Sequence, residues 1–343
     1  MTETHPSPLQ QLTKRMRPAL QDQLQSIIDQ ALGPDMGELH TMLSYQMGWV
    51  GEGAGPQAQG KQIRPVLLLL TAQAGGGSWK DALPAAGAVE LLHNFSLIHD
   101  DIQDDSPTRR GRPSVWKKWG RAQAINTGDA MYTLAYRSLH ELQNTYSPQI
   151  ILQAYHVFNQ TCFRLTEGQH LDLKFEEQEE MPLDDYWSMV ERKTGALLEG
   201  AMEIGALCAG VSKSRQHAFR AFGLNLGLAF QALDDILGIW GEKEVMGKSN
   251  QSDLVTGKKT LPILYGIAQK GDFYTAWRSG KITPRDVSRL ARLLEKEGAR
   301  RFASQKAARL TEIALENLEK AQPAGKAGAA IRDLATQLLQ RRG

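Results

Sequence analysis

The stretch GALLEGAMEIGALCAG, residues 195–210, is apolar on more than one face of the helix that its residue spacing predicts. Such a helix belongs in the middle of a helix bundle or at a subunit interface, because a surface helix needs a polar side. The ranges 84–104, 147–174 and 214–240 have the same character. The sequence therefore predicts several central helices packed against one another.

The remaining apolar residues recur three and four positions apart, as in helices with one buried face. No β-hairpin signal or alternating run stands out. We therefore predict an all-α fold. The expected helices are 20–32, 62–75, 84–104, 122–140, 147–174, 184–209, 214–240, 260–268, 286–295 and 299–318.

Glycine- and proline-rich breaks separate these helices. The main ones are Gly48–Gly60, Gly75–Gly77, Ser106–Ser114, Gly241–Lys258 and 323–325. None is long or polar enough to be an interdomain linker. Residues 1–343 are therefore predicted to form a single all-α domain, with a separable C-terminal cap as the alternative.

Composition excludes several classes of protein. The 343 residues can bury a large core without disulfide bonds or structural metals. A net charge of +2 gives no global field for nucleic acid. Cys162 and Cys208 lie in apolar stretches and are expected to be buried thiols. The N-terminus has no apolar signal core, and the run 66–70 is too short to span a membrane. We expect a soluble, cytoplasmic protein that binds no nucleic acid.

Acidic residues close two of the apolar helices. In FSLIHDDIQDD, residues 95–105, Asp100 and Asp104 lie one turn apart on one helix face, where like charges repel. In FQALDDILG, residues 230–238, Asp234 and Asp235 again follow an apolar segment. Each pair taken alone has the simpler interpretation of a solvated helix end. Two such pairs favour a divalent cation, and carboxylates without His or Cys select Mg²⁺ or Mn²⁺.

A magnesium site of this kind implies a substrate that carries phosphate, and basic residues support it. Lys61 and Arg64 open a helix, Arg109 and Arg110 follow the first acidic group, and Lys193 interrupts an apolar helix. Taken one at a time, these are ordinary surface charges; several cations around one cavity suit a diphosphate. The segment GPQAQGKQ, residues 55–62, is not a nucleotide-binding P-loop, because it ends in Gln and no strand precedes it.

These residues together resemble the trans-isoprenyl diphosphate synthases, also called polyprenyl synthetases. The shared motifs are Gly60-Lys61-x-x-Arg64-Pro65, Asp100-Asp101-x-x-Asp104, Arg109-Arg110-Gly111, Gly168-Gln169, Lys193-Thr194-Gly195, Gln231-x-x-Asp234-Asp235, Gly247-Lys248 and Lys258. They occur in the family's order across residues 50–260, which is far more specific than one acidic motif.

The resemblance implies an isoprenoid-synthase-type helical bundle around a central cavity, in a homodimer, and a transferase that serves isoprenoid biosynthesis. An allylic diphosphate (dimethylallyl, geranyl or farnesyl) would bind through three Mg²⁺ ions. The residues assigned to that site are the metal ligands Asp100, Asp104 and Asp234 and the cations Arg109, Lys193, Lys248 and Lys258.

The second substrate implied by the resemblance is isopentenyl diphosphate. Its expected ligands are Lys61, Arg64, His93 and Arg110. His93 alone has the ordinary interpretation of a core histidine, but it lies two turns before Asp100 on the same face. Thr194 and Gln231 would direct oxygen dipoles at the allylic cation that forms when diphosphate leaves.

Two positions depart from the family pattern. Gly238 stands where many members have a third Asp, one turn beyond Asp234, which puts one metal ligand in doubt. Gln62 replaces a basic residue that is common beside Lys61.

Product length is predicted from the residues one turn before Asp100. Similar enzymes stop at fifteen carbons when both positions are aromatic, whereas here Phe95 is aromatic and Ser96 is small. We expect mainly geranylgeranyl diphosphate, with twenty carbons, and farnesyl or geranylfarnesyl diphosphate as alternatives. Functions of other classes are a class I terpene cyclase, which needs no second diphosphate site, and a non-catalytic synthase subunit, whose acidic motif should be eroded.

Overall fold

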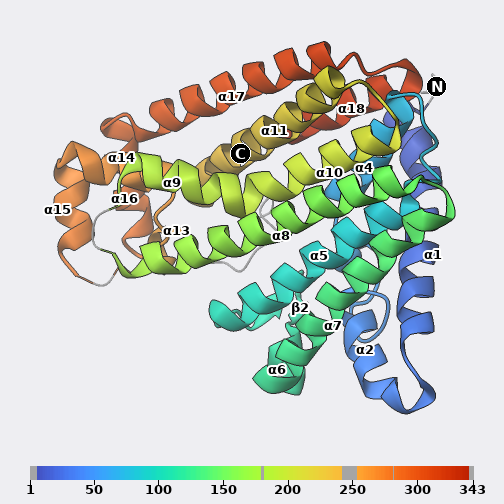
Figure 1. Cartoon of the computed structure of the whole chain (residues 1–343). Coiled ribbons are helices and arrows are strands. Elements are labelled where there is room, and N and C mark those ends of the chain that lie inside the picture. Colours follow the sequence, from blue (N-terminus) through green and yellow to red (C-terminus); the bar gives the residue numbers. More distant parts are fainter. Residues whose placement is uncertain (1–5, 179–180, 242–252, 281, 340–343) are drawn as a thin grey trace, which may run out of the picture. The chain divides into compact units, whose positions relative to one another are not determined.

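A computed structural model of the chain describes residues 6–178, 181–241, 253–280 and 282–339 (Figure 1). Its contacts divide into two compact units. The first holds residues 1–159, 200–219 and 321–334, and the second holds residues 160–199, 220–320 and 335–343. Five of the described helices contribute residues to both units, so the division does not follow the predicted breaks. The single-domain organisation of residues 1–343 stays a prediction.

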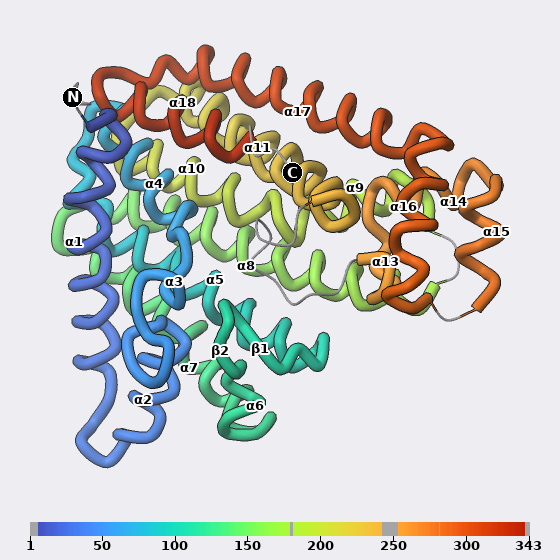
Figure 2. The backbone as a smooth tube through the Cα atoms, turned by 180° about the vertical axis from the view of Figure 1, so that it is seen from behind, coloured from blue at the N-terminus to red at the C-terminus, as the bar shows by residue number. Residues whose placement is uncertain are grey.

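The first unit is helical apart from one small hairpin. Its elements are α1 (Pro8–Ala31), η1 (Pro34–Met36), α2 (Gly37–Gln46), α3 (Pro56–Gln59), α4 (Ile63–Ala74), α5 (Leu83–Gln103), β1 (Thr108–Arg109), β2 (Arg112–Pro113), α6 (Val115–Trp119), α7 (Arg121–His140) and η2 (Glu141–Asn144), with parts of α8 (Pro148–Glu177), α10 (Ala196–Cys208), α11 (Lys213–Trp240) and α18 (Gly325–Leu339). Helix α5 packs against α1, α4 and α7 (Figures 1 and 2).

Helix α5 is central because its first half carries no polar face. Residues 85–92 are all buried, and so are residues 65–72 of α4. Small side chains let α5 approach α7 closely: a Cβ at Gly87 would lie 2.7 Å from the Ser138 hydroxyl. This packing fixes the helix whose end carries the first acidic motif.

The second unit contains the rest of those shared helices and a set of shorter ones. Its own elements are α9 (Leu183–Val190), the π-helical turn η3 (Glu191–Gly195), α13 (Asp253–Thr256), α14 (Leu261–Gln269), α15 (Asp272–Arg278), α16 (Val287–Lys296) and α17 (Ala299–Ala321). One core surrounds Tyr186 and Leu264, and another surrounds Phe273 and Leu290. The first of these cores lies behind the second acidic motif.

The predicted helices are all present, and most end within three residues of the predicted limits. The first is longer than predicted. It begins at Pro8 because Ser7 and Gln10 form a capping box, with Gln10 N–H donating to Ser7 Oγ at 3.3 Å. Pro18 lies inside this helix without ending it.

Some elements escaped the sequence prediction. Helices α2, α15 and α18 were not expected. The prediction that the chain has no hairpin was wrong, because β1 and β2 form one short pair. Thr108 pairs with Pro113, and Arg109 pairs with Arg112. Arg110 and Gly111 turn the chain with φ angles of 52° and 76°, the left-handed geometry of a tight hairpin. A pair of this length has no apolar alternation to detect.

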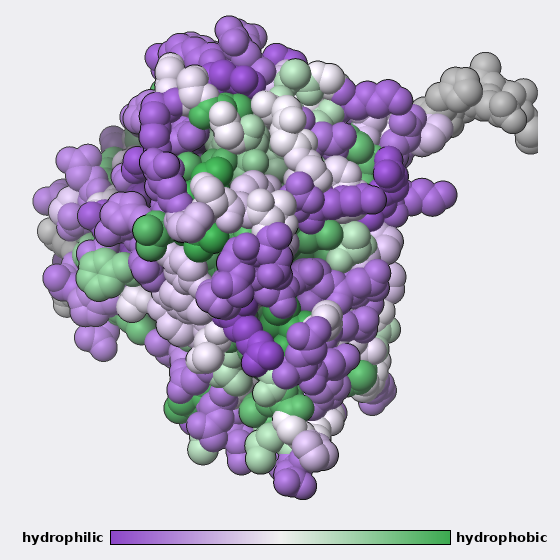
Figure 3. Space-filling view, turned by 45° about the vertical axis from the view of Figure 1, so that its right-hand side comes forward, coloured by the Kyte–Doolittle hydropathy of each residue, from purple (hydrophilic) through white to green (hydrophobic). Residues whose placement is uncertain are grey.

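The surface is mixed in character. On the face that Figure 3 shows, hydrophilic residues predominate and hydrophobic ones lie scattered between them. Both cysteines are buried, as predicted. Among the described helices, α11 alone has the length and hydropathy of a membrane span, and 56% of that stretch is buried in the protein. Core helices pass the same test.

Candidate functional site

The first unit gathers basic residues at the start of α4. Arg64 lies in its first turn, and Arg64 Nη1 is 3.2 Å from His93 Nε2 on α5. Burial, and then the charges of Arg64, Arg110 and Arg109, hold the pKa of His93 well below its ordinary value of 6.5. His93 is therefore neutral at physiological pH.

Arg110 reaches the same place from the hairpin turn. Its Nη1 donates to the Ala58 carbonyl at 2.8 Å, and its guanidinium lies against Gly60, where a Cβ would be 2.7 Å from Arg110 Cζ. Gly60 has a φ of 74°, so both its conformation and this contact require glycine. Lys61 follows directly and is exposed. The four residues predicted for one diphosphate are thus neighbours at the N-terminus of α4, which itself favours anions.

The first acidic motif closes α5. Asp100 and Asp104 are partly exposed, whereas Asp101 is buried and forms an ion pair with Arg109. Burial raises the pKa of Asp101, and the hydrogen bond and charge of Arg109 partly offset that rise. Within the motif, Asp101 fixes Arg109, whereas Asp100 and Asp104 remain partly accessible to solvent.

The donor chemistry of this motif fits Mg²⁺. It offers hard carboxylate oxygens only, without the His or Cys that other metals prefer. Among the described residues no three metal-ligating side chains converge into a protein cage. That arrangement suits an ion that takes one or two carboxylates and completes its shell with water and phosphate oxygens.

The residues predicted to limit product length lie one turn before Asp100. The ring of Phe95 packs 4.7 Å from His99 and 5.0 Å from Tyr132 of α7, measured between centroids. Ser96 Oγ donates to the His93 carbonyl at 2.8 Å, which keeps this small side chain against its own helix. Phe95 therefore begins an aromatic row between α5 and α7, and the next residue in the chain, Ser96, is small.

In the second unit, Lys193 and Thr194 lie in the π-helical turn η3. Such turns occur often at functional sites, because the extra residue redirects side chains. Lys193 Nζ forms an ion pair with Asp172 of α8. Thr194 Oγ1 donates to Gln231 Oε1 at 3.0 Å, and Gln231 Nε2 donates to Asp235 Oδ1 at 2.8 Å. The three predicted catalytic residues are thus held by named partners.

Two glycines let neighbouring helices approach this turn. A Cβ at Gly168 would lie 2.6 Å from Lys193 Cα, and a Cβ at Gly227 would lie 3.1 Å from Gly195 Cα. The Gly168-Gln169 motif therefore has a packing role that its sequence did not reveal. A larger side chain at residue 168 would push Lys193 out of place.

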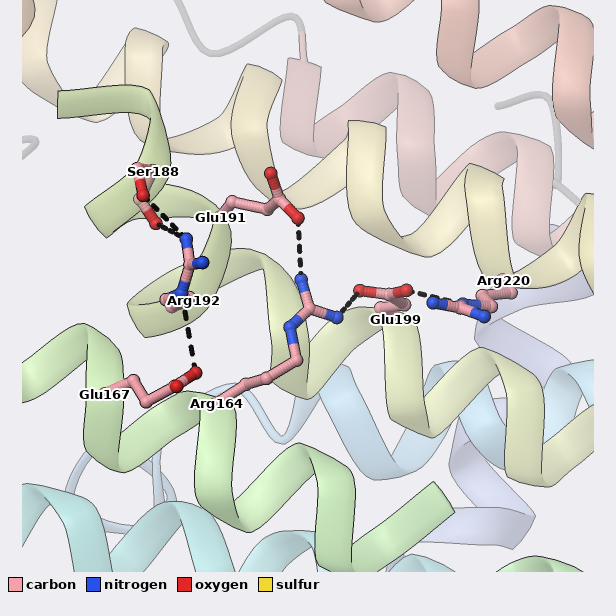
Figure 4. A network of polar contacts seen from close by, with 7 residues as sticks. All are labelled: Arg164, Glu167, Ser188, Glu191, Arg192, Glu199 and Arg220. Atoms are coloured by element: carbon pink, nitrogen blue, oxygen red, sulfur yellow. Dashed lines mark hydrogen bonds and ion pairs between the residues drawn. The ribbon is translucent and has the colours of Figure 1, made fainter. Parts of the chain in front are cut away.

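An ion-pair network holds the other side of the same turn (Figure 4). Arg164 lies between Glu191, at 2.9 Å, and the buried Glu199, which Arg220 also contacts. Arg192 Nη1 donates to Ser188 Oγ at 2.6 Å. Neighbouring residues of η3 thus have different partners: Glu191 and Arg192 join the network, whereas Lys193 and Thr194 contact Asp172 and Gln231.

The second acidic motif closes α11. Asp234 is partly exposed, while Asp235 is buried and accepts hydrogen bonds from Tyr186 Oη at 2.6 Å and Leu261 N–H at 2.8 Å. Burial raises the pKa of Asp235 to about 6, and its hydrogen-bond donors limit the rise. Asp235 ties α9 and the start of α14 to α11.

The packing at the end of this motif explains why residue 238 is a glycine. A Cβ there would lie 2.8 Å from Asp253 Cγ and closer still to the carboxylate. Asp253 begins α13, so a carboxylate from a later segment lies beside the position where the family pattern has its third Asp. Lys258 is exposed, whereas the neighbouring Lys259 Nζ donates to the Phe175 carbonyl at 2.5 Å. Lys248 lies outside the described residues.

The structure therefore groups the predicted residues within each unit. Lys61, Arg64, His93, Arg109, Arg110, Asp100 and Asp104 belong to the first, and Lys193, Thr194, Gln231, Asp234 and Lys258 belong to the second. Sequence reasoning missed the polar partners Glu90, Asp172, Tyr186 and Asp253. Glu90 had a signal, since it lies three residues before His93 in an otherwise apolar helix.

Comparison with known proteins gives consistent results. The family model described as polyprenyl synthetase matches residues 55–292. A (2E,6E)-farnesyl diphosphate synthase of Mycobacterium tuberculosis is 37% identical, over 88% of this chain and 86% of its own. A geranylgeranyl diphosphate synthase of Methanosarcina mazei is 39% identical, over 76% and 80%.

Solved structures agree with these sequence relatives. A polyprenyl synthase from Caulobacter crescentus, crystallised with calcium and isoprenyl diphosphate, has a TM-score of 0.83 at 28% identity. The alignment covers 99% of this chain and all of that one. The all-α fold predicted from sequence is confirmed.

Proposed function

The chain belongs to the polyprenyl synthetase family and is a trans-prenyltransferase; from that premise we propose that it condenses isopentenyl diphosphate with an allylic diphosphate to give mainly geranylgeranyl diphosphate. One observation carries the proposal. The first unit has a basic cluster at Arg64 and Arg110 beside His93, and the carboxylates of Asp100 and Asp104 lie seven and eleven residues after His93, at the end of the same helix. Helix α5 thus offers a place for each of two diphosphates.

The allylic diphosphate would bind through Asp100, Asp104 and Asp234 by way of about three Mg²⁺ ions, with Mn²⁺ as a substitute. The hard oxygen donors support this, and the Caulobacter relative was crystallised with calcium and isoprenyl diphosphate. When bound, Mg²⁺ neutralises the diphosphate and makes it a better leaving group. Arg109, Lys193, Lys248 and Lys258 would add positive charge around it.

The protein's own residues then guide the bond changes. The allylic C–O bond breaks and its electron pair leaves with the diphosphate. The alkene of isopentenyl diphosphate forms the new C–C bond, and the released diphosphate accepts the proton that is lost. The oxygens of Thr194 and Gln231, fixed by their shared hydrogen bond, would stabilise the cation between these events.

The activity test is direct. Purified protein is incubated with Mg²⁺, farnesyl diphosphate and isopentenyl diphosphate, and products are dephosphorylated and separated by chromatography. A synthase needs both substrates. Product from farnesyl diphosphate alone would indicate a terpene cyclase, and no product would indicate a non-catalytic subunit.

The twenty-carbon product is proposed from Phe95 and Ser96, since named relatives make either farnesyl or geranylgeranyl diphosphate. Phe95→Ala should open the space beside Tyr132 and lengthen the product. Ser96→Phe should close it and shorten the product. Unchanged length in Phe95→Ala would place the limit elsewhere, at Leu92 or Val89.

The division between the two diphosphate sites has its own test. Lys61→Ala and Arg64→Ala should raise the KM for isopentenyl diphosphate by about tenfold or more and leave that for farnesyl diphosphate nearly unchanged. Equal effects on both substrates would contradict the division.

We also propose a cytoplasmic homodimer. Two large apolar side chains on α8 are exposed in the single chain, Leu152 at 70% and Phe163 at 65%. They lie eleven residues apart, about three turns, on the same side of this helix. Sedimentation of the wild type and of a Leu152→Glu/Phe163→Glu variant measures the effect, with a monomeric wild type as the contrary result.

A further inference from the structure

Glu90 is a buried acid that the proposed reaction does not use. Its side chain lies on α5 with 2% of the residue exposed. Oε1 accepts a hydrogen bond from Asn94 Nδ2 at 3.1 Å, and Asn94 Oδ1 accepts one from Gln46 Nε2 of α2 at 3.4 Å. Oε2 has no hydrogen-bond partner among the described residues. Such a group is costly to keep unless something makes use of it.

The charges facing Glu90 come from the predicted isopentenyl diphosphate site. They are Arg110, from the turn between β1 and β2, and Arg64, from α4. Each arginine also has a hydrogen-bond partner, His93 for Arg64 and the Ala58 carbonyl for Arg110. His93 is neutral, and Asn94 contributes only a dipole. Glu90 is thus a buried acid that interacts with the charges of the two arginines assigned to this substrate.

A purely structural role for Glu90 does not explain why this residue is an acid. A glutamine would keep the Asn94 hydrogen bond and bury no charge, so packing alone does not call for an acid here. Burial and the charge of Arg109 disfavour the cationic form of Arg110, and the carboxylate of Glu90 offsets part of that cost while the site is empty.

We propose that Glu90 is a charge-compensating residue of the isopentenyl diphosphate site, which offsets the positive charge of Arg64 and Arg110 in the empty site and takes up a proton from solvent when the diphosphate binds. This inference rests on the proposed function. The incoming diphosphate supplies the negative charge that Glu90 provided before. Two anions on the same pair of cations in a buried place are unfavourable, and protonating the carboxyl removes one of them.

Burial raises the pKa of Glu90 to about 7, although Arg110, Arg64 and Asn94 each lower it. The group is therefore mostly ionised at pH 8 and mostly neutral at pH 6. Diphosphate binding shifts the balance further towards the protonated form. Binding at pH 8 should consume close to one proton, and this linkage weakens binding as the pH rises above 7.

Isothermal titration calorimetry of isopentenyl diphosphate at pH 8, in two buffers of different ionisation enthalpy, counts these protons. At this pH the substrate itself is fully ionised. We expect uptake of nearly one proton by the wild type and none by Glu90→Gln. At pH 6 the wild type and Glu90→Gln should have nearly the same Kd. At pH 8 the wild-type Kd should be about ten times that of Glu90→Gln, so the wild type binds more weakly.

A matched control is Glu141→Gln. Glu141 is a carboxylate of the same unit that bonds to Gln23 and to neither arginine, so its loss should leave proton uptake unchanged. Absence of proton uptake by the wild type, or a Kd ratio that does not vary with pH, would overturn the proposal. The first measurement needs no variant, so it stands even if Glu90→Gln does not fold.

The proposed function fails in a different way. If Arg64→Ala leaves the KM for isopentenyl diphosphate unchanged, the site assignment is wrong. If Arg64→Ala raises that KM while the wild type takes up no proton, the role of Glu90 alone is wrong.

Discussion

The ends of α5 and α11 carry the same acidic pair and use it differently. In each, the first Asp is partly exposed and the second is buried. Asp101 pairs with a cation, Arg109, whereas Asp235 accepts hydrogen bonds from the neutral donors Tyr186, Leu261 and Gln231. The exposed partners, Asp100 and Asp234, are the proposed metal ligands.

This difference shows what the second Asp does. At the end of α5 it aims a side chain that the substrate would meet, because Arg109 is 30% exposed. At the end of α11 it joins three elements of the second unit, and its hydrogen-bond donors among the described residues are all neutral. Each pair thus has one partly exposed Asp, the proposed ligand, and one buried Asp, the anchor, whose partners differ between the two motifs.

The largest expected effect separates ligand from anchor. Asp100→Ala and Asp234→Ala should each lower kcat by about a hundredfold to a thousandfold, since each removes a group that binds the leaving diphosphate through metal. The Tm should stay the same or rise, because Asp100→Ala also removes a like-charge repulsion with Asp104. Steady-state kinetics and thermal unfolding test this. A variant that keeps wild-type turnover, or one that unfolds, would contradict the assignment.

The two anchors should differ in stability. Asp235→Ala leaves the buried Tyr186 hydroxyl and Leu261 N–H without an acceptor and should cost about 3 kcal/mol in the free energy of unfolding. Asp101→Ala should cost about 1 kcal/mol, because Arg109 can reach water. Urea unfolding of both variants provides the comparison. Equal losses would mean that the anchors are equivalent.

The third effect concerns pH. The pKa of Asp235 in the folded protein, about 6, lies above its ordinary value of 3.8. Its contribution to stability is therefore greatest below pH 4 and is lost as the pH rises through 6. Relative to Asp235→Asn, the wild type should lose on the order of 2 kcal/mol between pH 4 and pH 7. A difference that does not change with pH would place Asp235 in a more solvated site than its burial indicates.

The sequence singled out the proposed metal ligands of this comparison but not the anchors. Helix periodicity locates α5 and α11, and the repeated Asp pairs mark their ends. Whether Asp101 or Asp235 is buried depends on partners such as Arg109 and Tyr186, eight and 49 residues away. The π-helical turn at Lys193 and the packing role of Gly168 were also not predicted, because the close approach of two backbones leaves no pattern in the local sequence. The two-residue strands were missed because an element of that length is too short to show an apolar period.

The smallest expected effect tests how the second motif ends. Gly238→Ala places a methyl group against the Asp253 carboxylate, whose Cγ would be 2.8 Å away. Alanine gains about 1 kcal/mol over glycine inside a helix, but the collision should outweigh this gain and leave a net loss of about 1 kcal/mol. The matched control is Gly37→Ala in α2, where a Cβ meets nothing within 4 Å and stability should hold or rise. In Gly238→Ala/Asp253→Ala the collision is gone, so urea unfolding should show the loss recovered. If Gly238→Ala is as stable as Gly37→Ala, Asp253 does not occupy the space beside residue 238, and the two acidic motifs end alike.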